Sequence, residues 1–134
     1  MGVIAKNKNE IRFYYSSESS VGKQVLGFIH SSDKKVLDID ISKTKVTGTQ
    51  WAEIARGLDK EIRELIDTSH PDFIHHYGRD VQMDDGHDWL KILENTPSVL
   101  QRPIIVNGDR YIQIFAPPDV KKFLDEESAQ IEDN

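Results

Sequence analysis

The sequence predicts an α/β fold, a mixed four-stranded sheet with helices on its faces, in a single domain. The order of the elements carries this prediction. A strand, a helix and a strand come first, a helical block follows, and a strand pair and a final helix close the chain. Strands joined by a crossover helix favour parallel pairing, whereas strands joined by a tight turn pair antiparallel. The 134 residues suffice for one compact core, which we expect over residues 10–124.

The first strand and helix follow from residue type and period. Residues 10–15 (EIRFYY) are mostly β-branched or aromatic and end at a serine cluster, which predicts a largely buried strand. Val21, Val25 and Ile29 then recur at i, i+4 and i+8, so they share one face of a helix. A serine at position 19 or 20 is available as its N-cap. We expect this helix to pack its apolar face against the sheet.

The second strand and the helical block come next. In VLDIDI, residues 36–41, aliphatic residues alternate with aspartate, which predicts an edge strand with Leu37 and the isoleucines on one face. Thr47 and Gln50 have the spacing of a capping box at the start of a helix. Apolar residues at helical period predict further short helices near residues 62–66, 71–77 and 89–97.

A hairpin follows the helical block. Two apolar runs, 103–106 and 111–115, are joined through Asn107 and Gly108, the dipeptide that most readily supplies the two positive φ values of a tight hairpin turn. We expect the first run to be antiparallel to the second. We also expect the first run to be parallel to the strand at 10–15.

The chain closes with a helix and a tail. Pro117 and Pro118 start the final helix, because proline is tolerated in a first helical turn. Residues 125–134 (DEESAQIEDN) are acidic and nearly free of apolar residues, so we expect a frayed tail. The complete order of elements is that of a thioredoxin-like fold with a helical insertion.

Composition excludes several classes of function. The chain has 17 Lys and Arg against 23 Asp and Glu residues, a net charge of −6, which argues against direct nucleic-acid binding through a basic face. It has no cysteine, so disulfides, thiolate nucleophiles and thiolate metal ligands are excluded. No apolar stretch approaches the ~20 residues of a membrane-spanning helix, and residues 1–9 lack the apolar core of a secretory signal. We therefore expect a soluble, cytoplasmic protein without membrane contact.

Two stretches carry a resemblance to a known family. Residues 95–124 are NTPSVLQRPIIVNGDRYIQIFAPPDVKKFL. This stretch resembles the end of the ArsC-type arsenate reductases and their Spx-type relatives, which have a helix, a Leu-Gln/Asn-Arg-Pro-Ile-Val strand, a turn and a proline-started helix. FYYSSESSVGKQVLGFI, residues 13–29, lies where that family has its first strand, its Asn-Pro-x-Cys loop and its first helix. The resemblance covers residues 10–124 and implies an ArsC-like fold of the thioredoxin and glutaredoxin type.

The chain departs from this family at the catalytic position. The family's cysteine falls on Ser19, and the preceding Asn-Pro pair falls on Ser16 and Ser17. In the family this cysteine attacks arsenate from a helix N-terminus, where free backbone N–H groups and the helix dipole lower its pKa. A serine hydroxyl is far less acidic than a thiol of pKa about 8.5, and it forms no disulfide with glutathione. The resemblance thus implies a member that has lost thiol redox chemistry.

The family's arginines are also mostly missing. Its reductases use three arginines around the oxyanion, of which only Arg102 persists, while the other two fall on Asp67 and Ala116. These replacements change the charge of the site by about three units, enough to remove strong oxyanion selectivity. Pro103 falls on the family's cis-proline, so a cis peptide bond between Arg102 and Pro103 is expected.

A candidate anion site lies at the start of the first helix, where free backbone N–H groups can donate hydrogen bonds to an oxyanion. Its side chains are Ser16, Ser17, Ser19, Ser20 and Lys23, with Arg102 across the loop. Glutathione, phosphate or another small anion would fit such a cradle. The same residues also suit a capped helix with a polar loop, and the sequence leaves both interpretations open.

Histidines and aspartates in the middle of the chain suggest a metal site only weakly. His70, His75, His76 and His87 lie among several aspartates, and imidazole with carboxylate suits zinc. His75 and His76 are adjacent, so on a helix they point about 100° apart and do not easily line one site. A solvated surface is the preferred interpretation, and no metal is assigned. Asp38 and Asp40 are likewise interpreted as a solvated strand face rather than an acid/base pair.

Two functions follow from these observations. The first is a non-catalytic binding or regulatory protein with a protein partner, by fold-level analogy with the Spx-type regulators. The second is a glutathione- or oxyanion-binding protein, or an enzyme, that uses the loop from Ser16 to Lys23. No resident cofactor is expected, and no residue is assigned a catalytic role. Turnover of arsenate is not expected, because no thiol is present to carry the electrons.

Overall fold

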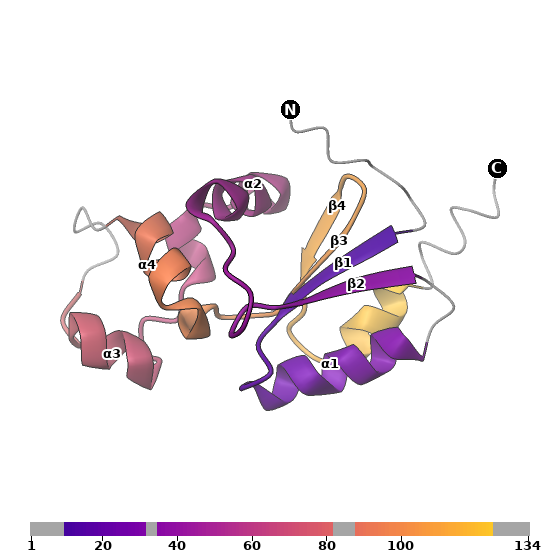
Figure 1. Ribbon diagram of the computed structural model, residues 1–134, viewed down its shortest axis with the longest axis horizontal. Helices are drawn as coiled ribbons and strands as arrows, with labels where there is room; N and C mark the ends of the chain where they lie inside the picture. Colours follow the sequence, from indigo (N-terminus) through magenta and orange to yellow (C-terminus); the bar gives the residue numbers. More distant parts are fainter. Residues whose placement is uncertain (1–9, 32–34, 82–87, 125–134) are drawn as a thin grey trace.

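The computed structural model describes residues 10–31, 35–81 and 88–124. Their strands form one mixed four-stranded sheet in the order β2-β1-β3-β4 (Figure 1). The strands are β1 (Glu10–Tyr15), β2 (Lys35–Asp40), β3 (Ile104–Asn107) and β4 (Arg110–Gln113). β1 is parallel to β2, and β3 is antiparallel to β4, as the sequence predicts. The α/β fold class is therefore confirmed.

The direction of β3 differs from the prediction. β3 is antiparallel to β1, with Ile104 opposite Tyr14 and Asn107 opposite Ile11, so the expected parallel pairing is wrong. The reason is the path of the helical block. This block leaves the sheet after the end of β2, beside Tyr15, and returns to the same end of the sheet at Ile104. A strand that enters there runs back against β1.

The helices cover both faces of the sheet. α1 and a C-terminal helix, which covers residues 118–124 in the described part of the chain, lie on one face, and the helical block lies on the other (Figure 1). Proline starts the C-terminal helix, as expected. The labelled elements are α1 (Ser20–His30), α2 (Gly48–Leu58), α3 (Pro71–Tyr77) and α4 (Trp89–Asn95), with 3₁₀ turns at Ile62–Leu65 and Pro97–Val99.

Side-chain caps explain where the first two helices begin. Ser19 is the N-cap of α1, where its hydroxyl accepts a hydrogen bond from the N–H of Gly22. Thr47 and Gln50 form the predicted capping box of α2, because each side chain accepts from the backbone N–H of the other residue. These bonds satisfy N–H groups that have no partner within the helix.

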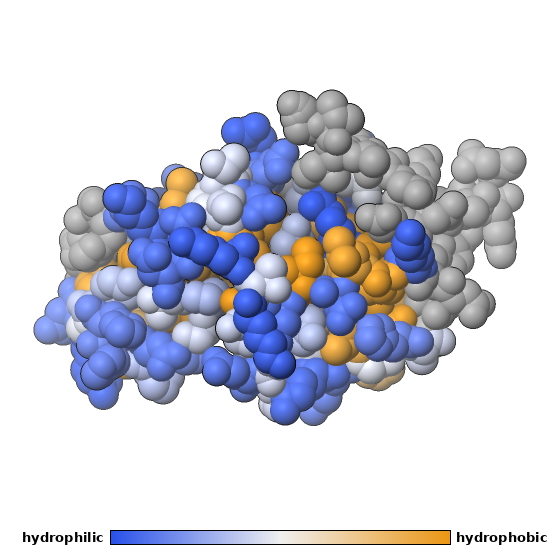
Figure 2. Space-filling view, viewed as in Figure 1, coloured by the Kyte–Doolittle hydropathy of each residue, from blue (hydrophilic) through white to orange (hydrophobic). Residues whose placement is uncertain are grey.

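Alternation along the strands divides the core into two layers. Phe13 is fully buried against α1 and the C-terminal helix. Tyr14 lies on the opposite face of the sheet and packs with Trp51 of α2 in the core formed by the helical block. Leu37 is 51% exposed, although the alternating pattern places it on the apolar face of β2 with Ile39. The helical block lies at the carboxyl end of β2 and leaves the first half of this edge strand uncovered (Figure 1). Figure 2 shows hydrophobic side chains gathered over the strands on this side of the molecule.

The hairpin turn also differs from the prediction. Its central residues are Gly108 and Asp109, because Asn107 pairs with Arg110 inside the strands. Only Gly108 has a positive φ, at 61°. Glycine at the first central position with a positive φ is the requirement of a type II′ turn, so the expected pair of positive φ values is wrong. Asn107 belongs to the strand and is 3% exposed.

Within the described ranges, none of the helices is long and apolar enough to cross a membrane. The predicted tail at 125–134 lies outside the described residues.

Candidate functional site

A pocket of about 350 Å³ opens where β1 ends and α1 begins. Four parts of the chain line it: the end of β1 with the loop that follows, Ile41 after β2, residues 67–72, and residues 98–103. The β1–α1 loop is the position of the catalytic loop in the family that the sequence resembles. The pocket is therefore the candidate ligand-binding site beside this loop.

Four of the predicted site residues line this pocket: Ser16, Ser19, Arg102 and Pro103. Ser17, Ser20 and Lys23 are not among its lining residues, and Lys23 is exposed on α1. The structure thus brings Arg102 to the start of α1, as the sequence predicts, but it separates part of the candidate anion site from the pocket.

The serine hydroxyls are already engaged within the loop. The Ser19 hydroxyl accepts from Gly22 N at 3.2 Å, and the Ser16 hydroxyl accepts from Glu18 N at 3.2 Å. The hydroxyl of Ser17 lies 3.1 Å from that of Ser42. These bonds stabilise the loop and the helix start, so the capped-helix interpretation accounts for the hydrogen bonds of these three serines.

Asp40, at the end of β2, is the carboxylate that the loop binds. Its Oδ1 accepts hydrogen bonds from Ser17 N at 3.1 Å and from the backbone and hydroxyl of Ser42 at 3.0 and 2.7 Å. Burial raises the pKa of Asp40, but the hydrogen bonds from Ser17 and Ser42 outweigh burial and lower the pKa to about 2. The same carboxylate and that of Asp38 add to burial in raising the pKa of Tyr15. The carboxylate of Asp40 thus occupies the hydrogen-bond donors of Ser17 N and Ser42 beside the loop.

Arg102 presents an incompletely satisfied cation at the pocket wall. Its Nε is buried and has no hydrogen-bond partner among the described residues. Its guanidinium carbon lies 5.2 Å from the centroid of the Phe115 ring, within the range of a cation–π interaction. Phe115 is itself 56% exposed.

The peptide bond before Pro103 is trans, because the described residues contain no cis peptide bond. The expectation of a cis-proline is therefore wrong. The trans form is the default for proline by about 0.5–1 kcal/mol. Backbone hydrogen bonds hold the chain on both sides of this bond, from Gln101 N to Leu65 O and from Ile114 N to Pro103 O.

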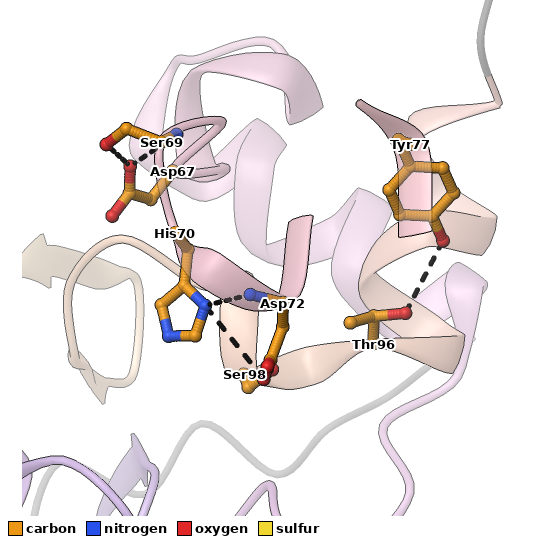
Figure 3. A network of polar contacts seen from close by, with 7 residues as sticks. All are labelled: Asp67, Ser69, His70, Asp72, Tyr77, Thr96 and Ser98. Atoms are coloured by element: carbon orange, nitrogen blue, oxygen red, sulfur yellow. Dashed lines mark hydrogen bonds and ion pairs between the residues drawn. The ribbon is translucent and has the colours of Figure 1, made fainter. Parts of the chain in front are cut away.

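The segment 67–72 supplies two carboxylates, Asp67 and Asp72, to the lining of the pocket, and Figure 3 shows the polar contacts that hold them. Asp67 accepts hydrogen bonds from the backbone and hydroxyl of Ser69. His70 Nδ1 accepts from Asp72 N at 3.0 Å, and the Ser98 hydroxyl donates to the Asp72 carboxylate. Sequence reasoning missed this network, because Ser98 joins Asp72 across 26 positions of sequence.

The two positions at which the family's arginines are replaced lie in different surroundings. Asp67 lines the pocket, so its negative charge replaces a positive one at the site itself. Ala116 is exposed and is not among the lining residues. Together with Glu18 and Asp72, Asp67 gives three carboxylates in the lining against the guanidinium of Arg102. This balance disfavours an oxyanion and favours a cationic group.

The histidines form no metal centre in the described part of the chain. No group of three or more His, Cys, Asp or Glu side chains there is placed to hold a metal ion. His75 and His76 on α3 meet edge to face at 5.0 Å between ring centroids, and only His70 reaches the pocket. His87 lies outside the described residues.

Comparisons with known proteins agree with this fold. The sequence matches no family model and no curated protein. An arsenate reductase from Vibrio cholerae is similar in structure, with 16% identity, a TM-score of 0.72 and coverage of 87% of this chain and 98% of the other. A provisionally assigned arsenate reductase from Yersinia pestis has 16% identity and a TM-score of 0.67, over 84% and 98% of the two chains.

A third similar structure is a provisionally assigned ArsC-family-related protein from Bacteroides fragilis. It has 12% identity and a TM-score of 0.69, over 87% of this chain and 98% of the other. At these identities the likeness shows the fold. This protein has the thioredoxin-like α/β fold of the ArsC-type arsenate reductases, without a cysteine.

Proposed function

We propose that this protein is a non-catalytic binding protein built on the ArsC fold, and that its pocket at the start of α1 receives a cationic group of a partner protein. The observation that carries the proposal is the composition of the pocket wall. Glu18, Asp67 and Asp72 line it with Arg102, at the place where an ArsC-type reductase needs a thiol and arginines. In this proposal the protein has lost thiol chemistry and acts by binding a protein partner.

The chemistry of Ser19 supports the non-catalytic part. Its hydroxyl is engaged as the cap of α1, and the bond from Gly22 N occupies an oxygen lone pair. A serine nucleophile needs an adjacent base, and His70 is bound to the backbone of Asp72 through Nδ1. Purified protein should therefore show no arsenate or disulfide reductase turnover with glutathione. Turnover that persists after repurification would contradict the proposal.

The negative charge of the pocket allows a direct test of whether the pocket binds a cationic group. We expect Nα-acetyl-argininamide, or a short peptide that contains arginine, to bind in a titration at low salt, and the neutral Nα-acetyl-glutaminamide not to bind. The double variant Glu18→Gln with Asp72→Asn should weaken binding at least fivefold, because it removes two of the carboxylates. Asp59→Asn is the matched control, since Asp59 is exposed outside the pocket and asparagine tolerates its left-handed backbone conformation, φ 58°.

The second candidate is binding of glutathione or a small oxyanion, and the buried unpartnered Nε of Arg102 favours it. In that case phosphate, arsenate or glutathione raises the melting temperature at low salt, and Arg102→Ala abolishes the rise. A ligand at 100 times its Kd adds about 2.7 kcal/mol of stability. A rise with these anions and none with the arginine probe would replace the first proposal by the second.

A further inference from the structure

A second hollow, which we call the β4 groove, lies along the edge strand β4. Its volume is about 450 Å³, and none of its lining residues also lines the pocket at α1. The end of α2, β4 and the C-terminal helix supply its walls. Tyr111 and Phe115 give it an aromatic surface, while Lys60, Gln113 and Lys122 supply polar groups. A largely apolar hollow of this size with a few polar groups is typical of small-molecule sites.

Gln113 has an unsatisfied hydrogen-bond donor in the wall of this groove. The residue is 5% exposed, and its Oε1 accepts a hydrogen bond from Lys60 Nζ. Its Nε2 is buried and has no hydrogen-bond partner among the described residues. A buried amide nitrogen without an acceptor is unfavourable, so native proteins rarely keep one without a reason. An oxygen acceptor in the groove would satisfy it.

Two lysines give the groove a positive charge. Lys60 Nζ lies 5.7 Å from the centroid of the Phe115 ring, and Lys122 is exposed on the C-terminal helix. Asp119 is the acidic residue in the lining, and its carboxylate accepts a hydrogen bond from Ala116 N at 3.0 Å. With two ammonium groups against this one carboxylate, the lining of the groove carries a net positive charge.

We propose that the β4 groove binds a small organic carboxylate with an apolar body. The carboxylate would accept from Gln113 Nε2 and lie near the ammonium groups of Lys60 and Lys122. The apolar body would pack on Tyr111 and Phe115, which explains why a large aromatic side chain, Phe115, remains 56% exposed. Inorganic phosphate satisfies the charges but leaves the apolar surface uncovered. A carboxylate with an apolar body matches both.

The test uses the full chain labelled with nitrogen-15 and the probes phenylacetate and hexanoate. We expect both to shift the side-chain amide signals of Gln113 and the backbone signals of β4, while signals of the β1–α1 loop stay in place. The neutral analogue phenylacetamide should bind at least fivefold more weakly, because it has no charge for the lysines. Stronger binding of phosphate than of phenylacetate, or shifts confined to the β1–α1 loop, would overturn the proposal.

Single variants distinguish specific binding of phenylacetate in the β4 groove from nonspecific attraction of the anion to surface lysines. Gln113→Met removes the amide donor with little change of volume, and Lys122→Gln removes one charge. Each should weaken phenylacetate binding at least threefold, and added salt should reduce the effect of Lys122→Gln. Lys91→Gln is the matched control, because Lys91 is exposed on α4 and does not line the groove. Equal loss in Lys91→Gln and Lys122→Gln would show nonspecific attraction and overturn the proposal.

Gln113→Glu keeps the proposal testable if the methionine variant does not fold. This change retains an acceptor for Lys60 but replaces the donor with a negative charge. We therefore expect a folded protein that no longer binds phenylacetate. Unchanged affinity in this variant would exclude Gln113 from the site. The argininamide titration tests the pocket at α1, and the phenylacetate titration tests the β4 groove. Because the two hollows share no lining residue, failure of one proposal leaves the other unaffected.

Discussion

At the scale of single residues, Asp40 shows how the β1–α1 loop differs from an anion-binding loop. Donors from Ser17 and Ser42 converge on this carboxylate, which belongs to the chain itself. The same loop carries Ser19, whose hydroxyl caps α1. In both cases the polar groups of the loop bind partners within the chain itself, and each case gives a prediction.

Asp40 should make stability depend on pH in the acid range. Its folded pKa of about 2 is below the ordinary value of 3.8, so its contribution is present above pH 4 and is lost as the pH falls toward 2. At neutral pH, Asp40→Ala should lower the free energy of unfolding by about 1 kcal/mol, because the donors lose their acceptor. Urea unfolding at several pH values measures this, and the difference from wild type should shrink below pH 4.

Asp38→Ala is the control for that experiment. Asp38 is exposed on the same strand, and its contact is a 3.9 Å approach to the exposed His30. An exposed pair of this kind contributes little. An equal pH dependence in the two variants would show that the hydrogen bonds of Asp40 are not the cause.

Ser19→Cys tests the other residue of the loop. The helix start should lower the pKa of the new thiol below about 8.5, which thiol alkylation as a function of pH measures. Arsenate turnover should nevertheless stay near background, because Asp67 faces the pocket and Ala116 adds no positive charge. Robust turnover in this single variant would show that the missing arginines matter less than we infer.

At the scale of elements, two helical glycines have opposite surroundings. A Cβ on Gly57, near the end of α2, would lie 2.3–2.5 Å from ring atoms of Tyr111 on β4. A Cβ on Gly27 in α1 would meet nothing within 4 Å. The close approach of α2 to β4 therefore depends on glycine at position 57.

Gly57→Ala and Gly27→Ala should change stability in opposite directions. Alanine at position 27 should stabilise the protein by about 0.5–1 kcal/mol, because alanine is the better helix former and loses less backbone entropy on folding. Alanine at position 57 should destabilise it, because the Tyr111 ring must move. Thermal unfolding of both variants measures this, and stabilisation by Gly57→Ala would contradict the described packing of Tyr111.

At the scale of the whole molecule, the two apolar layers share one sheet. β1 contributes Phe13 to one layer and Tyr14 to the other, so neither layer is complete without this strand. Such sharing favours cooperative unfolding of a single domain. We expect tryptophan fluorescence, in which Trp51 reports on the helical block, and far-UV circular dichroism to give one coincident urea transition. Two separated transitions would contradict the single-domain interpretation.

The local features of this protein follow from its sequence alone. The strand at 10–15, a serine cap at position 19 or 20 and the Thr47–Gln50 capping box follow from residues a few positions apart. The structure has the strand and the capping box as predicted, and of the two serines it uses Ser19. The absence of cysteine likewise needs no structure. Patterns of residue type thus sufficed for the element order and the α/β class, because local hydrogen bonding and hydrophobic period act within one element. The ArsC-like form of the fold was implied by the resemblance of residues 13–29 and 95–124.

Only the tertiary structure decided the features that join distant segments. The direction of β3 depends on where the helical block returns to the sheet, and the exposure of Leu37 depends on how far that block extends. Asp72 meets Ser98 across 26 positions, and Lys60 meets Gln113 across 53. No periodicity encodes such contacts, since they arise from the path of the chain. The acidic pocket wall and the β4 groove therefore became visible only in the folded molecule.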